Sequence, residues 1–289
     1  MVTSLPETVR STCATIAASA RHVRIDPAAG SATSGVVGFD PERHYLDGPR
    51  EWVARYVLVI DTINFGSGWF PTLRHGETEA MTDRLAAFAR GRAAGPWWGA
   101  ELRALTAGDV AAVLDEDPEH ELMGLYAEGL RQLGAWVADR DALALVDAAG
   151  GSAARFAQAL ATNMGFFADA GFYKRAQIAA NDLVLAGAVE FADVDALTVF
   201  ADNFLPHVLR LDGVLVYDDA LAARIDAGAL LEPGSAPERE LRACTIHACE
   251  QLAQRAGVAP RILDNWLWNR ALEGGYAARP AHLCRTVFY

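Results

Sequence analysis

The chain has 289 residues, 52% of them hydrophobic and 21% charged, and its net charge at pH 7 is −12. This length and apolar content suffice for a sizeable core in one large domain or two small ones, and they exclude a largely disordered chain. The negative charge argues against polymeric nucleic acid as a partner, because proteins that grip a phosphate backbone normally carry a basic stripe.

The cysteine pattern bears on the compartment. Cys13, Cys244, Cys249 and Cys284 are sparse and show no paired spacing, which favours a reducing cytoplasm over a disulfide framework. The first residues lack the basic and apolar regions of a signal peptide, and no apolar run approaches the roughly 20 residues of a membrane span. We therefore expect a cytoplasmic protein without membrane association.

In chain order, the first predicted element is an amphipathic, alanine-rich helix over 7–20, and a loop rich in Pro, Gly and Ser follows over 26–40. Residues 50–64 contain the apolar run 56–60, whose β-branched side chains favour a strand. The run is short enough that a buried helix is equally compatible with it.

Three further helices are predicted next, over 77–92, about 100–114 and 119–140, with an acidic break at 115–118. From 141 to 190 the chain is very rich in alanine, and its larger apolar side chains keep helical spacing. The first half of the chain therefore reads as mainly helical.

The second half also reads as helical. A helix is predicted from about 172 to 186, and Asp193 could cap the next one, which Pro206 should bend or end because proline has no amide hydrogen to donate. A last long helix should stop at Gly257. We predict a mainly α, compact single domain over 1–289 with at most a few short strands. The inner face of the helix after Asp193 would carry Leu197, Phe200 and Phe204.

The segment 64–70, Asn-Phe-Gly-Ser-Gly-Trp-Phe, is the first that could carry chemistry. Glycine lets a backbone approach a flat ligand closely, and aromatic rings offer stacking faces. The alternative is a turn whose aromatic side chains fill the core.

The second such segment is 172–177, Phe-Tyr-Lys-Arg-Ala-Gln, which holds the only lysine of the chain, Lys174. If the segment opens a helix, its first-turn amides and two cations form an anion site. The alternative is a solvated basic turn.

Two groups of charged residues follow. Asp202 is flanked by Val199 and Leu205, so its carboxylate could be partly buried and useful to a mechanism, or simply exposed. Glu238, Glu240 and Arg242 have the helical spacing that is typical of surface ion pairs. The sequence offers no metal site, because Cys244, His247 and Cys249 lack paired CxxC arms.

Together with the aromatic tail, these segments resemble the queuosine salvage protein family, the queuosine 5′-phosphate N-glycosidases. The resemblance runs from about residue 20 to residue 289. The chain departs from the family pattern at Asn203-Phe204 and Pro206-His207. The shared motifs are Asn64-Phe65 followed by Trp69, Tyr-Lys-Arg-Ala-Gln at 173–177, Phe-Ala-Asp at 200–202 with Pro206, Glu240-x-Arg242, Leu267-Trp268, and the tail residues His282, Arg285 and Tyr289.

The resemblance implies a fold similar to the helical DNA glycosylases, which favours a helix over 50–64. It implies hydrolysis of queuosine 5′-monophosphate to queuine and ribose 5-phosphate without a cofactor, and it identifies Asp202 as the catalytic carboxylate. Such a group would offset the positive charge that builds on the sugar as the glycosidic bond breaks.

The expected substrate contacts follow from the ligand. A 7-deazapurine has carbon where a purine has N7, so its departure depends on stacking and on hydrogen bonds to other edges. We expect Phe65, Trp69 and Phe172 to clamp the base, and Lys174 and Arg175 to bind the 5′-phosphate. Asp264 and Glu240 are candidates for the amine of the queuine side arm. Further predicted substrate-binding residues are His22 and Arg285 near the phosphate, with Asn64, Tyr173 and His207.

Three alternatives remain open. The altered residues near Asp202 leave room for a glycosidase that acts on another modified or ordinary nucleotide. A non-catalytic binder of a 7-deazaguanine base or nucleotide is a second reading. A DNA repair glycosylase fits poorly with the net charge of −12.

Overall fold

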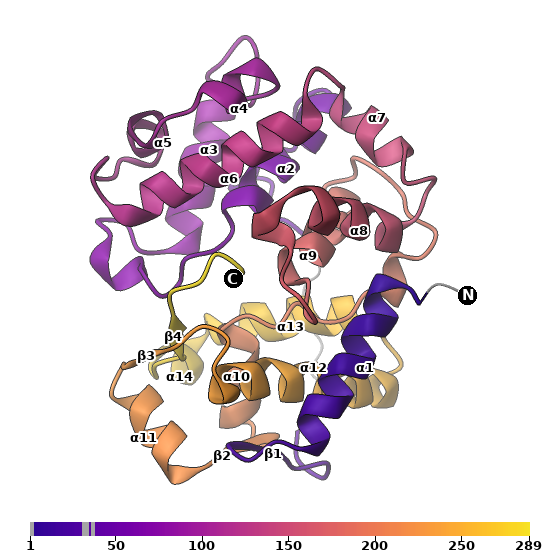
Figure 1. Ribbon diagram of the computed structural model, residues 1–289, viewed down its shortest axis with the longest axis vertical. Helices are drawn as coiled ribbons and strands as arrows, with labels where there is room; N and C mark the ends of the chain where they lie inside the picture. Colours follow the sequence, from indigo (N-terminus) through magenta and orange to yellow (C-terminus); the bar gives the residue numbers. More distant parts are fainter. Residues whose placement is uncertain (1–2, 31–34, 36–37) are drawn as a thin grey trace.

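The computed structural model describes residues 3–30, 35 and 38–289, and it is mainly helical, as predicted (Figure 1). The loop predicted over 26–40 lies partly outside these residues. No helix of the described part of the chain is both long and apolar enough to cross a membrane.

The described strands are short and form two pairs. Strand β1 (Val23–Ile25) lies antiparallel to β2 (Leu215–Tyr217), and β3 (Leu230–Leu231) lies parallel to β4 (Leu283–Cys284). The first pair ties the segment after the N-terminal helix to the segment that follows α10 (Phe204–Leu211).

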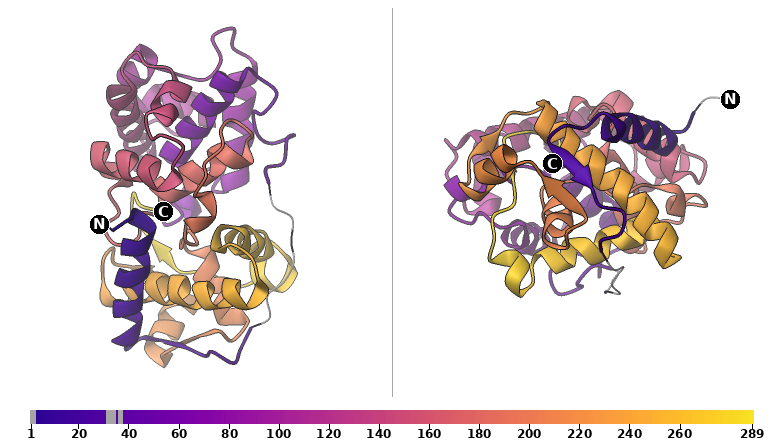
Figure 2. Two further views of the ribbon diagram at one scale, coloured as in Figure 1. Left: turned by 90° about the vertical axis from the view of Figure 1, so that its right-hand side faces the viewer. Right: turned by 90° about the horizontal axis from the view of Figure 1, so that it is seen from below.

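The helices fall into two groups, seen one above the other in Figure 1 and in the left view of Figure 2. Helices α8 (Ala153–Asn163) and α9 (Lys174–Leu185) pack against each other and join the groups. Helix α9 also contacts α2 (Arg50–Ile63), and α8 contacts α1 (Leu5–Ala18). The upper group comprises α2 (Arg50–Ile63), α3 (Thr78–Arg90), α4 (Ala100–Ala104), α5 (Ala107–Leu114), α6 (Glu121–Val137) and α7 (Ala142–Asp147). The lower group comprises α1 (Leu5–Ala18), α10 (Phe204–Leu211), α11 (Asp219–Asp226), α12 (Ala236–Ala256), α13 (Pro260–Ala271) and α14 (Gly274–Ala277). Between them lie α8 (Ala153–Asn163) and α9 (Lys174–Leu185), and short 3₁₀ turns occur at Phe70–Thr72, Gly165–Phe167 and Val194–Ala196.

Helix α2 decides between the two interpretations of 50–64. The strand that its β-branched run favoured is wrong, and the helix implied by the family resemblance is confirmed. Every residue from 56 to 63 is buried, because α2 packs against α3, α6, α7 and α9. A helical stretch that is covered on all sides needs no polar face, so the apolar run 56–60 shows no helical periodicity.

The helices predicted over 7–20, 77–92, 119–140 and 172–186 are confirmed as α1, α3, α6 and α9. The helix predicted over 100–114 is two helices, α4 and α5. They separate at Thr106, whose hydroxyl accepts a hydrogen bond from the Asp109 amide and so caps α5.

In place of the helix predicted after Asp193 there is only a 3₁₀ turn, Val194–Ala196, which the Asp193 side chain does not cap. Asp193 instead caps α8, because its carboxylate accepts hydrogen bonds from the Ser152 hydroxyl and the Ala153 amide, both at 2.6 Å. Residues 197–203 have no regular secondary structure, and α10 begins only at Phe204.

Two predicted helix boundaries had different outcomes. Pro206 is the third residue of α10, where helix amides have no partner within the helix, so it neither bends nor ends the helix. Gly257 ends α12 with a φ of 68°, as predicted, because glycine adopts the left-handed conformation without strain.

Candidate active site

A cavity of about 950 Å³ is lined by residues of α2, α3, α9, α10 and α13. Its wall holds one lysine and four buried aspartates, none more than 7% exposed. Such a concentration of buried ionisable groups in a cavity is typical of a functional site. These residues are Lys174, Asp61, Asp182, Asp202 and Asp264.

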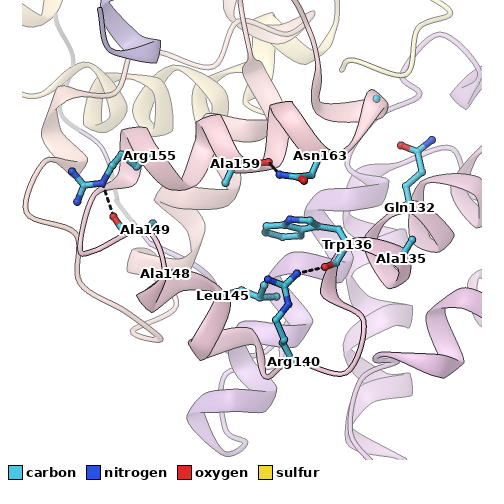
Figure 3. Close-up of a pocket in the computed structure, with 11 residues that line it drawn as sticks. Gln132, Ala135, Trp136, Arg140, Leu145, Ala148, Ala149, Arg155, Ala159 and Asn163 are labelled. Atoms are coloured by element: carbon cyan, nitrogen blue, oxygen red, sulfur yellow. Dashed lines mark hydrogen bonds between the residues drawn. The ribbon is translucent and has the colours of Figure 1, made fainter. Parts of the chain in front are cut away.

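A second hollow, of about 820 Å³, opens between α6, α7 and α8 (Figure 3). Its two arginines are already engaged, since Arg155 donates to the Ala149 carbonyl at 2.7 Å and Arg140 donates to the Trp136 carbonyl. Among the described residues that line it, none is acidic. The hollow therefore offers a surface but no acid–base chemistry, and the acidic cavity is the candidate active site.

Asp202 lies just before α10 and is held by the start of that helix. Its Oδ1 accepts hydrogen bonds from the amides of Phe204 at 2.7 Å and Leu205 at 3.2 Å. In the described part of the chain, no other residue donates a hydrogen bond to the second carboxylate oxygen, Oδ2. Burial raises the pKa of Asp202, while Lys174 and the two amides act in the opposite direction. The carboxylate is thus fixed through one oxygen, and the other is available to a ligand.

The segment that leads to Asp202 is buried, so its backbone polar groups need partners from side chains. The Thr198 amide donates to Gln177 of α9 at 3.1 Å, and the Phe200 amide donates to Asp264 of α13 at 2.6 Å. Side chains from two helices therefore fix the backbone just before Asp202.

Arg242 of α12 provides a third support for this segment. Its Nε donates to the Ala201 carbonyl at 3.1 Å, and its two terminal nitrogens bond to the carboxylate of Asp169. Glu238 lies 3.6 Å from the guanidinium, and the ring of Tyr289 lies 4.6 Å from it. The expectation of a surface ion pair is wrong, since Arg242 and Glu238 are at most 3% exposed.

Lys174 is 4% exposed and is the cation most closely tied to the cavity carboxylates. Burial lowers its pKa, whereas Asp202, Asp264 and Asp61 raise it. The ammonium therefore already has counter-ions within the protein, which weakens its assignment as a phosphate ligand.

Arg175 points away from the cavity, so the geometry does not support it as a phosphate ligand. It donates to the carbonyls of Thr62 at 2.9 Å and Phe166 at 3.0 Å, and it is 1% exposed. Its guanidinium lies 4.7 Å from the centroids of the Phe65 and Phe167 rings. Arg175 thus stabilises the end of α2 and the segment 64–70 on the side away from the cavity.

Of the three aromatic residues predicted to clamp the base, Phe65 lines the cavity and the other two do not. Trp69 is turned aside, with its indole donating to Glu121 at 2.8 Å, and Phe172 lies 4.1 Å from the Arg242 guanidinium. Other aromatic side chains take the positions next to the cavity. They are Phe39, Phe70, Phe200, Phe204, Trp268 and Tyr289.

Glu240 and His22, two further predicted contacts, lie together outside the cavity. Glu240 accepts hydrogen bonds from the amides of Arg21, His22 and Val23, at 2.9, 2.6 and 3.2 Å, and so holds the start of β1. The His22 ring contacts Asp218 at 2.7 Å. Both side chains therefore stabilise the fold around β1 and do not line the cavity.

Three other predicted contacts also lie outside the cavity lining. His207 contacts the Tyr276 carbonyl at 2.9 Å, and Arg285 contacts the Gly68 carbonyl at 3.5 Å. Tyr173 is half-buried and precedes α9 with a φ of 50°. Of the predicted site residues, the structure brings together Asn64, Phe65, Lys174, Asp202 and Asp264.

The sequence did not point to several polar residues of the cavity wall, among them Asp61, Asn181 and Asp182. Burial raises the pKa of Asp61 to about 7 and raises that of Asp182 well above its ordinary value. One signal was present: Asp61 interrupts an otherwise apolar run. A carboxylate in such a run is costly unless it has a specific use.

Comparison with known proteins gives a consistent family. A family model described as queuosine salvage protein matches residues 44–289. A protein of Sphaerobacter thermophilus named queuosine 5′-phosphate N-glycosylase/hydrolase is 33% identical over 276 residues, which cover 86% of this chain and 84% of that protein. Proteins of the same name from Mus musculus and Nematostella vectensis are each 33% identical over 136 and 143 residues, with 41% of this chain covered and 40% and 41% of those proteins.

Proposed function

This chain belongs to the queuosine salvage protein family, and from that premise we propose that it hydrolyses the N-glycosidic bond of queuosine 5′-monophosphate. The products are queuine and ribose 5-phosphate. The alignment that supports this assignment covers most of both proteins.

The observation that carries the proposal is the placement of Asp202. Its carboxylate lines the cavity, is 7% exposed and is fixed through Oδ1 by two amides of α10. Breaking the glycosidic bond builds positive charge on the ribose, and a fixed anion stabilises that charge without reorganising. With Oδ2 toward the ribose, Asp202 can either attack C1′ or orient the attacking water.

Lys174 has a different role in this proposal from the one expected from the sequence. Burial alone would favour a neutral Asp202, and the ammonium opposes that effect. Lys174 therefore acts mainly by keeping Asp202 ionised.

The 5′-phosphate then needs another cation. Arg43 lines the cavity, and its side chain is 44% exposed. Its guanidinium nitrogens lie 3.6 Å from the carboxylate of Asp83 and 3.9 Å from that of Asp40, so both ion pairs are long. An exposed guanidinium with loose partners can turn to a phosphate and bind it through two hydrogen bonds.

The departing base requires stacking more than protonation, since a 7-deazapurine has no N7 to protonate. Phe204 and Trp268 line the cavity as an edge-to-face pair with ring centroids 6.0 Å apart. Phe65 lines it as well and is held from behind by Arg175. We propose that these rings replace the clamp of Phe65, Trp69 and Phe172 that the sequence suggested.

Mass spectrometry of the products tests this function. Incubation with queuosine 5′-monophosphate should yield queuine and ribose 5-phosphate, while guanosine and 7-deazaguanosine monophosphates serve as comparison substrates. Faster hydrolysis of a comparison substrate would indicate a glycosidase for another nucleotide. Tight binding of queuine with no hydrolysis of any nucleotide would indicate a non-catalytic binder.

Organisation and location are part of the same proposal. Residues from both helix groups line one cavity, so we propose that 1–289 acts as a single domain. The four cysteines are free and buried, which fits a reducing compartment such as the cytoplasm. The substrate is the free nucleotide and not a polymer, in keeping with the net charge of −12.

A further inference from the structure

Part of the cavity wall is made of acceptors that lack donors. Asp61 of α2 and Asn181 and Asp182 of α9 line it, with exposures of 1%, 3% and 7%. We call these three residues the acidic pole. Asp61 Oδ2 and Asn181 Oδ1 are buried and have no hydrogen-bond partner in the described part of the chain.

The acidic pole cannot satisfy these atoms by itself. The amide nitrogen of Asn181 already donates to Asp182 Oδ1 at 2.9 Å, which turns the Asn181 oxygen away from that contact. Buried polar atoms without partners are rare in folded proteins, and each calls for a specific explanation. A bound group that supplies two N–H donors would provide one here.

The charge of the wall indicates what kind of donor this is. Lys174 is the lysine among four buried aspartates of the cavity. Its positive charge interacts with Asp202 and Asp264 as well as with the carboxyls of the acidic pole. Burial raises the pKa of both pole carboxyls, that of Asp61 to about 7, which favours their protonated forms. A ligand that brings its own positive charge can take the place of those protons.

We infer that the acidic pole binds the ammonium group of the substrate side arm and so selects a base that carries this arm. The inference rests on the proposed function, in which queuosine supplies a secondary amine on its side arm. The edge of the deazaguanine ring also offers two N–H donors, but it is neutral. It could satisfy the unpartnered oxygens, but it brings no positive charge, so at least one pole carboxyl would have to stay protonated to avoid a buried, uncompensated charge.

Calorimetric titration of queuine and of 7-deazaguanine, which lacks the side arm, tests the inference on the whole protein. Asp182→Asn keeps the acceptor for Asn181 but removes the charge. We expect it to weaken queuine binding by about tenfold or more and to leave 7-deazaguanine binding nearly unchanged. Equal weakening for both ligands, or none for either, would overturn the inference.

Glu116→Gln is the matched control. Glu116 is a carboxylate outside the cavity, 7% exposed, that accepts hydrogen bonds from the amides of Arg74 and His75. This variant should bind both ligands as the wild type does. A loss in Glu116→Gln similar to that in Asp182→Asn would show that the effect comes from the fold, against the inference.

A second measurement needs no variant. Titrations of the wild type near pH 7 in two buffers of different ionisation enthalpy count the protons that binding releases. Asp61, Asp182, Lys174, Asp202 and Asp264 all face the cavity and can contribute. The difference in proton release between the two ligands leaves out the protons that binding of the ring alone releases. Queuine should release more protons than 7-deazaguanine, and equal release would contradict the inference.

These binding measurements separate this inference from the proposed function. Selective binding of queuine that depends on Asp182, without hydrolysis of the nucleotide, would support the acidic pole and contradict the hydrolase. Hydrolysis of the nucleotide, together with equal weakening of queuine and 7-deazaguanine binding by Asp182→Asn, would support the hydrolase and contradict the acidic pole. Failure of the wild type to bind either ligand would overturn the inference, whereas the product analysis alone decides the hydrolase.

Discussion

The carboxylate of Asp264 accepts a hydrogen bond from the Phe200 amide at 2.6 Å, two residues before Asp202. The residues around Phe200 are buried without regular secondary structure, so this bond helps to determine where Asp202 lies. A side chain of α13 thereby positions the proposed catalytic carboxylate at the start of α10. Asp264 is a positioning residue, and this role can be tested by how well different side chains replace it.

Asp264→Ala should lower kcat far more than Asp264→Asn. Alanine leaves the buried Phe200 amide without a partner, which costs about 1–3 kcal/mol of stability and lets Asp202 shift. Asparagine keeps an acceptor oxygen at the same place. Steady-state kinetics should show the loss for alanine mainly in kcat, with much of it restored by asparagine. Equal kcat in the two variants would refute the positioning role.

Asp202→Asn should fold normally and lose nearly all turnover. The asparagine oxygen still accepts from the amides of Phe204 and Leu205, but a neutral side chain cannot offset the cation that forms on the ribose. A loss of about 10²–10³-fold or more in kcat is expected. Thermal unfolding should be close to that of the wild type. A rate near that of the wild type would remove Asp202 from the mechanism.

Lys174→Met should lower activity on the nucleotide and on the unphosphorylated nucleoside by similar factors. The ammonium lowers the pKa of Asp202 against the effect of burial, so its removal leaves Asp202 more protonated at neutral pH. The acidic limb of the pH–rate profile should therefore move to higher pH. A selective rise in KM for the nucleotide would instead assign Lys174 to the phosphate. Arg43→Ala is the comparison variant and should raise KM for the nucleotide selectively.

The sequence was sufficient to identify the family and to single out Asp202, which lies in the cavity wall, because the short motifs survive as ordered residue patterns. It could not tell which neighbour in a motif faces the cavity. Lys174 and Arg175 are adjacent, but successive residues of a helix point in different directions. The partner of Arg175, the Thr62 carbonyl, is 113 residues away in the chain. Local patterns carry no information about such a contact.

The secondary structure of two segments escaped prediction for a related reason. Residues 56–63 of α2 are all buried, so this apolar run lacks the periodicity that distinguishes a helix from a strand. Residues 197–203 have helical spacing but are held outside a helix by Gln177, Asp264 and Arg242. Tertiary contacts overrode the local pattern in both places.

The buried carboxyls should make the folded state less stable as pH rises. Burial raises the pKa of Asp264 from 3.8 to about 8, so between these values the native protein holds a proton that the unfolded chain has lost. Each such proton lowers the free energy of unfolding by about 1.4 kcal/mol per pH unit, until the native group also ionises near pH 8.

Urea unfolding of the wild type and of Asp264→Asn between pH 5 and pH 8 measures this contribution. The variant has no group to ionise at that position, so its free energy of unfolding should fall less steeply with pH. Asp61, whose pKa burial raises to about 7, remains in the variant and should still cause part of the decline below that pH. The same slope in both proteins would mean that Asp264 is already ionised in the native state at pH 5. In that case Lys174 would balance a permanent negative charge from Asp264, and less of its effect would be left to Asp202.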